Sequence, residues 1–416
     1  MWAQKARSDW VLFGDRNTRF FQTVVRQRRV RNRIIHLKRG DGSFTDDLGE
    51  IEDILAQHFR NAFEDNVPLS YDQILTEVGT LPLPQLSAHQ LSSLDRPVTI
   101  KEIEDTVFQL GSHKAPGPDG ILAFFYHEYW SIVKFDNFNT VLAFFHSRSL
   151  LKSLNATYIT LIPKVACLDN VNHFRPISLC YVIYKIISKL LVNHLKPFMD
   201  SFITPFQNAF IKGRNISDNI LLAHGIFDFL TKRKKRKKFY GALKIDMTKA
   251  YNRVDWKFLK AVLSSMNFSQ NWIKWILQCV TTVQFTLLVN GSLSQTFKPK
   301  RGLRQSDPLS PYLFLLCANF LSLALVQAEQ QNKIQGIRIG RNGCTFTHLL
   351  FADNSLLFFR RDDKSIDNIQ CVLQWYCFIS GQSIRGCLVC DFKQPFSVFK
   401  QHFTHFNALF HPHVFS

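Results

Sequence analysis

The stretch THLLFADNSLLFF, at residues 347–359, constrains the fold of this chain more than any other stretch. Two apolar runs with the composition of β-strands flank a short polar segment, and that segment carries Asp353. Such a pattern predicts a β-hairpin with a carboxylate at its tip. A carboxylate in that position can reach a metal ion.

A second acid, Asp246, lies at the end of another strand-like run in KIDMTKAYNRVDW, at residues 244–256, and helix-like sequence follows it. If the fold brings Asp246 and Asp353 together, the two carboxylates can hold divalent cations for phosphoryl transfer. Such sites clamp both reacting oxygens between two metal ions about 3.5–4 Å apart. Taken alone, Asp246 is more typical of a helix cap than of a metal site, and Asp353 is more typical of a turn.

Composition points to a globular protein with a polyanionic partner. The chain has 416 residues, a formal net charge of +19 and a hydrophobic fraction of 46%. A positive charge of this size suits nucleic acid, because each neutralised phosphate releases counterions. The nine cysteines are scattered and no signal peptide is evident, so we expect reduced thiols in an intracellular compartment, the nucleus or the cytoplasm.

Local patterns predict several further elements. Residues 99–110 read as a helix, residues 156–164 alternate like a strand, and residues 176–199 have the apolar spacing of one long helix. Residues 282–302 read as a hairpin that turns at Asn290-Gly291. The apolar run at 312–326 is too short to span a bilayer, which favours a buried helix and no membrane role.

Taken in order, these blocks resemble the reverse transcriptase of plant LINE-type (non-LTR) retrotransposons. KIDMTKAYNRVDW at 244–256 resembles the first acidic block of that family, and RGLRQSDPLSPYLF at 301–314 resembles the block that follows it. FADN at 351–354 stands where the family has Phe/Tyr-Ala-Asp-Asp. The remaining matches are GDRNTRFF (14–21), KAPGPDG (114–120), LIPK (161–164), FRPISLCYVIYKIISKLL (174–191) and QNAFIKGRNISDNILLAH (207–224).

The resemblance implies an α/β right-hand polymerase fold, with helix-rich fingers and a palm of antiparallel sheet backed by helices. It divides the chain into a helical, basic N-terminal extension (1–95), a fingers-like region (96–239), a palm-like catalytic region (240–380) and a divergent tail (381–416). The tail departs from the family, with Arg385 at an asparagine position and Leu388 at a lysine position. We therefore expect a truncated, degenerate copy with the thumb absent or incomplete and no nuclease domain ahead of it.

The resemblance also assigns chemistry to individual residues. It implies RNA-templated DNA synthesis on a DNA primer from dNTPs, with two Mg²⁺ ions, or Mn²⁺ in their place, bound by Asp246 and Asp353. Tyr251 corresponds to the ring that excludes ribonucleotides. The residues matched to nucleotide or template contacts are Lys164, Arg175, Gln305, Gly213 and Arg214. Lysine and arginine both suit phosphate, although ordinary surface charge is the alternative explanation of both residues.

Three departures predict that activity is weakened or lost. Asn354 replaces the second carboxylate of the hairpin block, Asn252 replaces an aspartate after Tyr251, and Ser306 stands where the family has glycine. An amide offers an oxygen but no charge, so Asn354, grouped here with the catalytic residues, weakens the hold on metal. A serine at 306 predicts either a strained backbone or a side chain that intrudes on the base pair.

Two rival functions follow from the same residues. One is a catalytically inactive retrotransposon remnant that only binds RNA, and the other is a maturase-like splicing cofactor. The basic run KRKKRKK (232–238) suits a solvated loop or a nuclear-localisation signal. Cys387, Cys390, His402 and His405 faintly resemble a zinc site, but the histidine spacing is too short.

Overall fold

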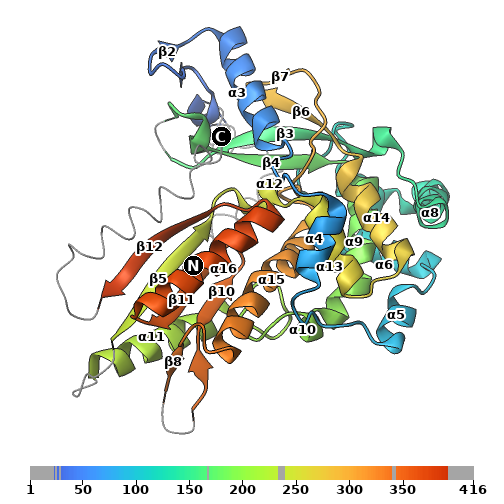
Figure 1. Cartoon of the computed structure of the whole chain (residues 1–416). Coiled ribbons are helices and arrows are strands. Elements are labelled where there is room, and N and C mark those ends of the chain that lie inside the picture. Colours follow the sequence, from blue (N-terminus) through green and yellow to red (C-terminus); the bar gives the residue numbers. More distant parts are fainter. Residues whose placement is uncertain are drawn as a thin grey trace. The chain divides into compact units, whose positions relative to one another are not determined.

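The computed structural model of the chain describes residues 23, 26–27, 30–165, 168–232, 239–339 and 343–391 (Figure 1). Among the predicted features, the block GDRNTRFF (14–21), residues 233–238 of the basic run, and both His402 and His405 lie outside these ranges. The chain divides into two compact units, which are considered one at a time. The first comprises residues 1–59, 158–177 and 286–296, and the second comprises 60–157, 178–285 and 297–416.

The first unit contains most of a four-stranded sheet with the strand order β4-β3-β6-β7. The predicted strand is β3 (Ala156–Pro163), and the predicted hairpin consists of β6 (Gln284–Val289) and β7 (Ser292–Leu293). Its turn has positive φ at both central residues, 51° at Asn290 and 100° at Gly291. An Asn-Gly pair favours this conformation, because its twist matches that of the flanking strands. Both predictions are confirmed. The other elements here are β1 (Leu37–Lys38), β2 (Phe44–Thr45), most of α3 (Leu48–Ala62), η3 (Val171–His173) and most of β4 (Phe174–Cys180).

The prediction of one long helix over 176–199 is wrong at its amino end. Residues 174–180 form strand β4, and the helix α9 (Val182–Leu195) begins only after Tyr181. Strand β4 pairs with β3 in the sheet, and this pairing outweighs the helical spacing of its apolar residues. Pro176 also fits an extended segment better than a helix interior.

The second unit is built on a sheet with the strand order β10-β11-β5-β12, in which every neighbouring pair is antiparallel. These strands are β10 (His348–Phe351), β11 (Asn354–Arg360), β5 (Tyr240–Met247) and β12 (Ile384–Asp391). Helix α11 (Ile216–Lys232) covers one face, where Ile226 and Leu230 pack with Ala242, Leu349 and Phe358. Strand β12 lies at the edge of this sheet. Its residues 384–391 belong to the segment that was predicted to be a divergent tail.

Helices make up the rest of the second unit. The predicted helix at 99–110 is α6 (Ile100–Gln109), whose capping box joins Thr99 and Glu102. The other elements are α4 (Tyr71–Val78), α5 (Ala88–Leu94), α7 (Ala123–Glu128), α8 (Trp130–Ser147), η2 (Lys152–Asn155), η4 (Lys196–Phe198), α10 (Met199–Phe202), α12 (Ala250–Arg253), α13 (Trp256–Ser265), α14 (Gln270–Thr281), α15 (Ser310–Gln330), β8 (Ile337–Arg338), β9 (Thr345–Phe346) and α16 (Asp363–Ser380).

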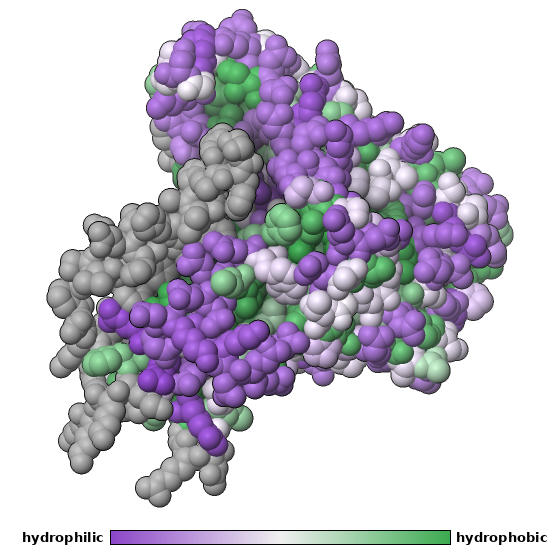
Figure 2. All heavy atoms as spheres, viewed as in Figure 1, coloured by the Kyte–Doolittle hydropathy of each residue, from purple (hydrophilic) through white to green (hydrophobic). Residues whose placement is uncertain are grey.

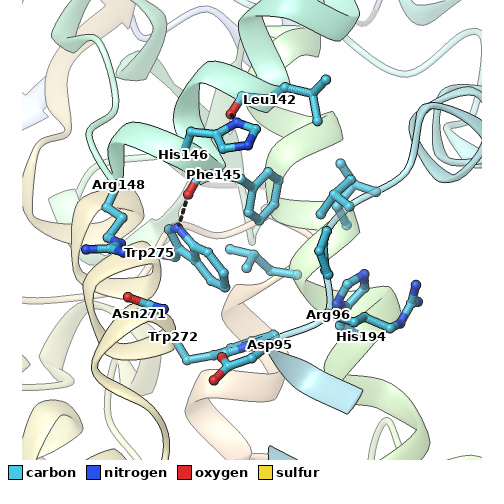
Figure 3. Close-up of a pocket in the computed structure, with 14 residues that line it drawn as sticks. Asp95, Arg96, Leu142, Phe145, His146, Arg148, His194, Asn271, Trp272 and Trp275 are labelled. Atoms are coloured by element: carbon cyan, nitrogen blue, oxygen red, sulfur yellow. Dashed lines mark hydrogen bonds between the residues drawn. The ribbon is translucent and has the colours of Figure 1, made fainter. Parts of the chain in front are cut away.

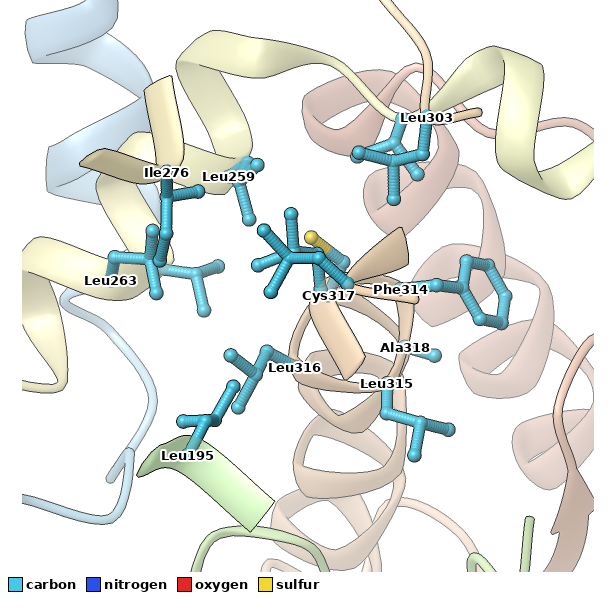
Figure 4. Packing of buried hydrophobic residues seen from close by; sticks show 14 of the residues in the cluster. Leu195, Leu259, Leu263, Ile276, Leu303, Phe314, Leu315, Leu316, Cys317 and Ala318 are labelled. Carbon is cyan, nitrogen blue, oxygen red and sulfur yellow. The ribbon is translucent and has the colours of Figure 1, made fainter. Parts of the chain in front are cut away.

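Helix α15 lies at the centre of the core. Figure 4 shows Leu316 and Cys317 of this helix facing Leu195 of α9 and Leu259 of α13. Burying a leucine side chain fully stabilises a fold by about 1.5–3 kcal/mol. Within the described residues, α15 is the one helix long and apolar enough to cross a membrane, but 72% of its most apolar window is buried inside the protein. The prediction of a buried helix is confirmed.

The fold is a mixture of helix and sheet, as predicted. Hydrophilic side chains cover much of the face seen in Figure 2, with smaller apolar patches between them. This distribution is typical of a globular protein.

Candidate active site

The sheet register brings the two predicted acids to neighbouring positions. Asp246 at the end of β5 lies directly opposite Asn354, the first residue of β11. The amide of Met247 donates a hydrogen bond of 3.2 Å to the carbonyl of Asp353. Asp246 and Asn354 are exposed, and Asp353 is partly buried. Cross-strand partners have their Cβ atoms about 4.5–5.5 Å apart, so Asp246 and Asn354 share one face of the sheet.

Asp353 lies in the two-residue turn of the predicted hairpin, since Phe351 and Asn354 form the last pair of β10 and β11. The other turn residue, Ala352, has a positive φ of 52°. This left-handed conformation costs a residue with a Cβ atom roughly 1–2 kcal/mol. The turn that presents Asp353 therefore needs support from the surrounding structure.

Gln207 supplies part of that support. Its side-chain Oε1 accepts a hydrogen bond of 3.0 Å from the amide of Ala352, and its Nε2 donates one of 3.4 Å to the carbonyl of the same residue. Oε1 also accepts from the amide of Ala209, and Gln207 is 1% exposed. A buried amide with three bonds fixes the backbone next to Asp353.

Two asparagines extend this support along β10. The Asn219 side chain donates to the carbonyl of Leu350 over 2.8 Å and accepts from the Asn208 side chain over 2.6 Å. The amide of Leu350 in turn donates to the carbonyl of Phe206. The resemblance identified this block, but its part in holding the hairpin was not predicted. Its signal was the pair of amide residues in QNAF, far along the chain from FADN.

The same block corrects one expectation. Arg214, matched by resemblance to a template contact, directs its guanidinium inward to Asp200 and to the carbonyls of Ile203, Thr204 and Gln207. Its donors thus hold a loop of the protein together. Gly213 beside it has a positive φ of 85°, a backbone conformation that favours glycine in this turn.

Tyr251 packs close to the acids. Its ring stacks on Phe314 with centroids 5.1 Å apart and planes at 18°. Burial, and secondarily the negative charge of Asp353, raise the pKa of Tyr251 to about 12. The hydroxyl is therefore neutral at physiological pH, and the ring is held rigidly near Asp353.

The loop at 301–309 carries Gln305 and two backbone features. Gly302 has a φ of 97°, and a Cβ there would come within 2.7 Å of the carbonyl of Asn252 and 2.9 Å of the Phe63 ring. A side chain at position 302 would therefore collide with the protein's own chain. Ser306 is exposed with a φ of 87°, which supports the predicted backbone strain. Gln305 is half-buried, and its carbonyl accepts from the amide of Ser178.

Behind this loop lies a buried polar cluster. Arg304 donates to the Asn155 side chain over 2.6 Å and to the carbonyl of Cys279 over 2.7 Å, and its guanidinium lies 3.7 Å from the centre of the Tyr184 ring. Tyr184 donates to the carboxylate of Asp307. Burial by itself lowers the pKa of Arg304, but these neighbours raise it above its ordinary value. The cluster fixes both ends of the segment 304–307.

Lys164 and Arg175 belong to the first unit, where both are exposed. The amide of Lys164 donates to the carbonyl of His173, and its Nζ donates to the carbonyl of Asn172. Partial desolvation, followed by the charge of Arg175, lowers the pKa of Lys164. Two adjacent cations of this kind favour an anion such as phosphate.

The donor set near Asp246 fits a metal that takes some ligands from its substrate. Mg²⁺ is commonly held by one or two carboxylates, with water and substrate phosphates completing the shell. Asp246 and Asp353 meet that requirement, and Asn354 adds a neutral oxygen. Among the described residues, no group of three or more His, Cys, Asp or Glu side chains could hold a metal.

A separate pocket of about 220 Å³ lies in the second unit (Figure 3). Most of its polar groups are bonded within the protein. The Trp275 indole donates to the carbonyl of Phe145, His146 bonds the carbonyl of Leu142, and Arg96 pairs with Glu102. The volume is below the 300–1,000 Å³ of usual ligand sites. This pocket is therefore a weaker candidate for a functional site than the pair of carboxylates at Asp246 and Asp353.

The reverse transcriptase (RNA-dependent DNA polymerase) family model matches residues 162–378, which is more than half of the chain. A fold of helices and sheet with two neighbouring carboxylates at a hairpin agrees with this match. The chain belongs to the reverse transcriptase family.

Its relatives include proteins of non-LTR retrotransposons. An uncharacterized 149 kDa protein of transposon TX1 from Xenopus laevis is 28% identical over 391 residues, which are 92% of this chain and 29% of that protein. The Pol polyprotein of the type-2 retrotransposable element R2DM from Drosophila melanogaster is 24% identical over 329 residues, which are 76% of this chain and 30% of that protein. An uncharacterized mitochondrial protein of Arabidopsis thaliana is 47% identical over 68 residues, 16% of this chain and 56% of that protein. The chain thus spans under a third of the first two relatives and just over half of the third.

Proposed function

We propose that the second unit carries the palm of a polymerase that copies RNA into DNA, and that this activity is weakened by Asn354. The observation that carries the proposal is the close approach of Asp246 and Asp353 in the folded chain. They are joined by the β5–β11 register and by the hydrogen bond from Met247 to Asp353. In this proposal, residues 96–239 act as fingers, residues 240–380 as palm, and the element of origin is of the plant LINE type.

The two carboxylates would bind divalent metal together with the phosphates of a dNTP. When bound, Mg²⁺ or Mn²⁺ supplies charge stabilisation to both reacting oxygens of the phosphoryl transfer. The rest of the work is positioning, since this reaction needs little covalent help from the protein. Asp246 and Asp353 lie on a rigid sheet and a supported turn, which suits that task.

Other residues would position the nucleotide and the primer–template. Tyr251 is a rigid ring beside Asp353 and would leave no room for a ribose 2′ hydroxyl. Lys164 and Arg175 are two adjacent cations suited to a triphosphate. Gln305 would contact the incoming nucleotide from a loop whose two ends are fixed by Arg304 and Asp307.

The polymerase activity is expected to be weak because a negative charge is missing at Asn354. Asn354 lies opposite Asp246, where the family's second carboxylate would add a full negative charge. Changes to groups around a bound metal typically reduce affinity or activity about 10- to 100-fold. We expect at least that loss here.

The alternative is a retrotransposon remnant that binds RNA without copying it. The net charge of +19 favours this function independently of the carboxylates. Asn252, Ser306 and Asn354 are the departures that favour it.

Primer extension on an RNA template, run beside filter binding to the same RNA, tests both functions. The variant Asn354→Asp should extend the primer at least tenfold faster than the natural chain, and Asp246→Asn should abolish extension in that background. RNA binding without extension by any variant would favour the remnant. Robust extension by the natural chain would contradict the proposed weakening.

A further inference from the structure

Asp246 has a neighbour on each side. On β11 its partner is Asn354, and on β12 its partner is Arg385. Directly opposed residues of antiparallel strands place their side chains on the same face, with Cβ atoms about 4.5–5.5 Å apart. Asp246, Asn354 and Arg385 are all exposed. Asp246 thus lies in register between an asparagine and an arginine.

Further positive charge lies close to these residues. Lys244 is two residues before Asp246 on β5 and is also exposed, so it projects from the same face. Arg253 lies near Arg385, since burial and then the charge of Arg385 lower the pKa of Arg253. Asp246 therefore shares its face of the sheet with two cationic residues, Arg385 and Lys244.

A guanidinium beside a carboxylate competes with a metal ion for it. Arginine is charged at every physiological pH, and its planar fork matches the two carboxylate oxygens. It also repels a divalent cation directly. The family has asparagine at the position of Arg385, by the resemblance stated above, so the competing charge is a property of this chain.

We propose that Arg385 is a built-in counter-cation of Asp246 that weakens divalent metal binding at the carboxylate pair. The inference rests on the proposed function, because it concerns the same metal site. The weak binding of metal then has two independent causes, the lost negative charge at Asn354 and the added positive charge at Arg385. Restoring aspartate at 354 by itself would leave the second source in place.

Binding of Mn²⁺ to the full chain, followed by the electron paramagnetic resonance signal of the free ion, tests this directly. Arg385→Asn should bind Mn²⁺ about tenfold more tightly than the natural chain, in line with the usual effect of groups around a metal. The double variant with Asn354→Asp should exceed both single variants. Arg148→Asn is the matched control, because it removes the same charge from an exposed residue just after α8 and away from the sheet.

The possible outcomes separate this inference from the proposed function. If Asp246→Asn abolishes Mn²⁺ binding while Arg385→Asn leaves it unchanged, the carboxylate site stands and the inference is wrong. An equal gain from Arg148→Asn would reduce the effect to net charge and also overturn it. If no variant binds Mn²⁺, both the inference and the metal site fail. Arg385→Gln serves as the second variant if circular dichroism shows that Arg385→Asn is unfolded.

Discussion

The side chain of Gln207 hydrogen-bonds both the amide and the carbonyl of Ala352, the residue before Asp353 in the hairpin turn. This contact joins two segments far apart in the sequence and fixes a turn that is strained at Ala352. It makes Gln207 a positioning residue for Asp353 under the proposed function.

Gln207→Leu should therefore reduce catalysis more than substrate binding. In the Asn354→Asp background we expect kcat for primer extension to fall about 10- to 100-fold with little change in KM for dNTP, because misplacement by about 1 Å costs on that order. Gln327→Leu is the control, since the Gln327 side chain bonds the carbonyl of Thr80 and not the hairpin. Equal effects of the two substitutions would contradict the positioning role.

Ser306→Gly should stabilise the protein. The φ of 87° at Ser306 is strained for any residue with a Cβ atom and is open to glycine. We expect the free energy of unfolding to rise by about 0.5–1 kcal/mol in urea titration, after allowing for the greater backbone freedom of glycine in the unfolded chain. Ser306→Ala should give no gain, and a gain equal to that of glycine would refute backbone strain as the cause.

Arg304→Met should destabilise the second unit strongly. Arg304 is 4% exposed, and its guanidinium bonds Asn155 and Cys279, while the buried carboxyl group of Asp307 lies nearby. Removing one member of a buried charged cluster costs about 3–5 kcal/mol. Thermal unfolding followed by circular dichroism measures the loss. A loss below about 1 kcal/mol would show that the cluster matters little.

Acid should destabilise the protein through His348. Burial lowers the pKa of His348 to about 3, and the imidazole bonds Ser322 and Thr347. Because the folded pKa lies below the unfolded value of about 6.5, the unfolded chain takes up the proton first, and stability falls as the pH drops from about 6.5 towards 3.

His348→Asn should therefore lose less stability than the natural chain between pH 7 and pH 5. The difference should be about 2 kcal/mol, the linkage term for this single group. Urea titrations at the two pH values measure it, with His146→Asn as an exposed control. Parallel losses in the natural chain and in His348→Asn would contradict the assignment.

The local elements were predictable because their signals are local. The Asn290-Gly291 turn, the capping box at Thr99 and the apolar runs around Asp353 each lie within a few neighbouring residues. The same holds for the buried helix α15, whose length and apolar composition mark it in the sequence.

The rest depends on contacts between distant segments. Nothing near Gln207 in the sequence tells that its side chain meets Ala352, and nothing near Arg385 tells that β12 pairs with β5 opposite Asp246. Nothing near Gly302 in the sequence tells that its backbone lies against the carbonyl of Asn252. The prediction of helix over residues 176–180 was wrong for the same reason, because pairing with β3 in the sheet holds this segment extended.

Anomalous diffraction from a Mn²⁺-soaked crystal of the Asn354→Asp variant tests the central claim most directly. The proposed site predicts one anomalous peak within coordination distance of both the Asp246 and the Asp353 carboxylates. A peak at other residues, or the two carboxylates held too far apart to share one ion, would contradict it.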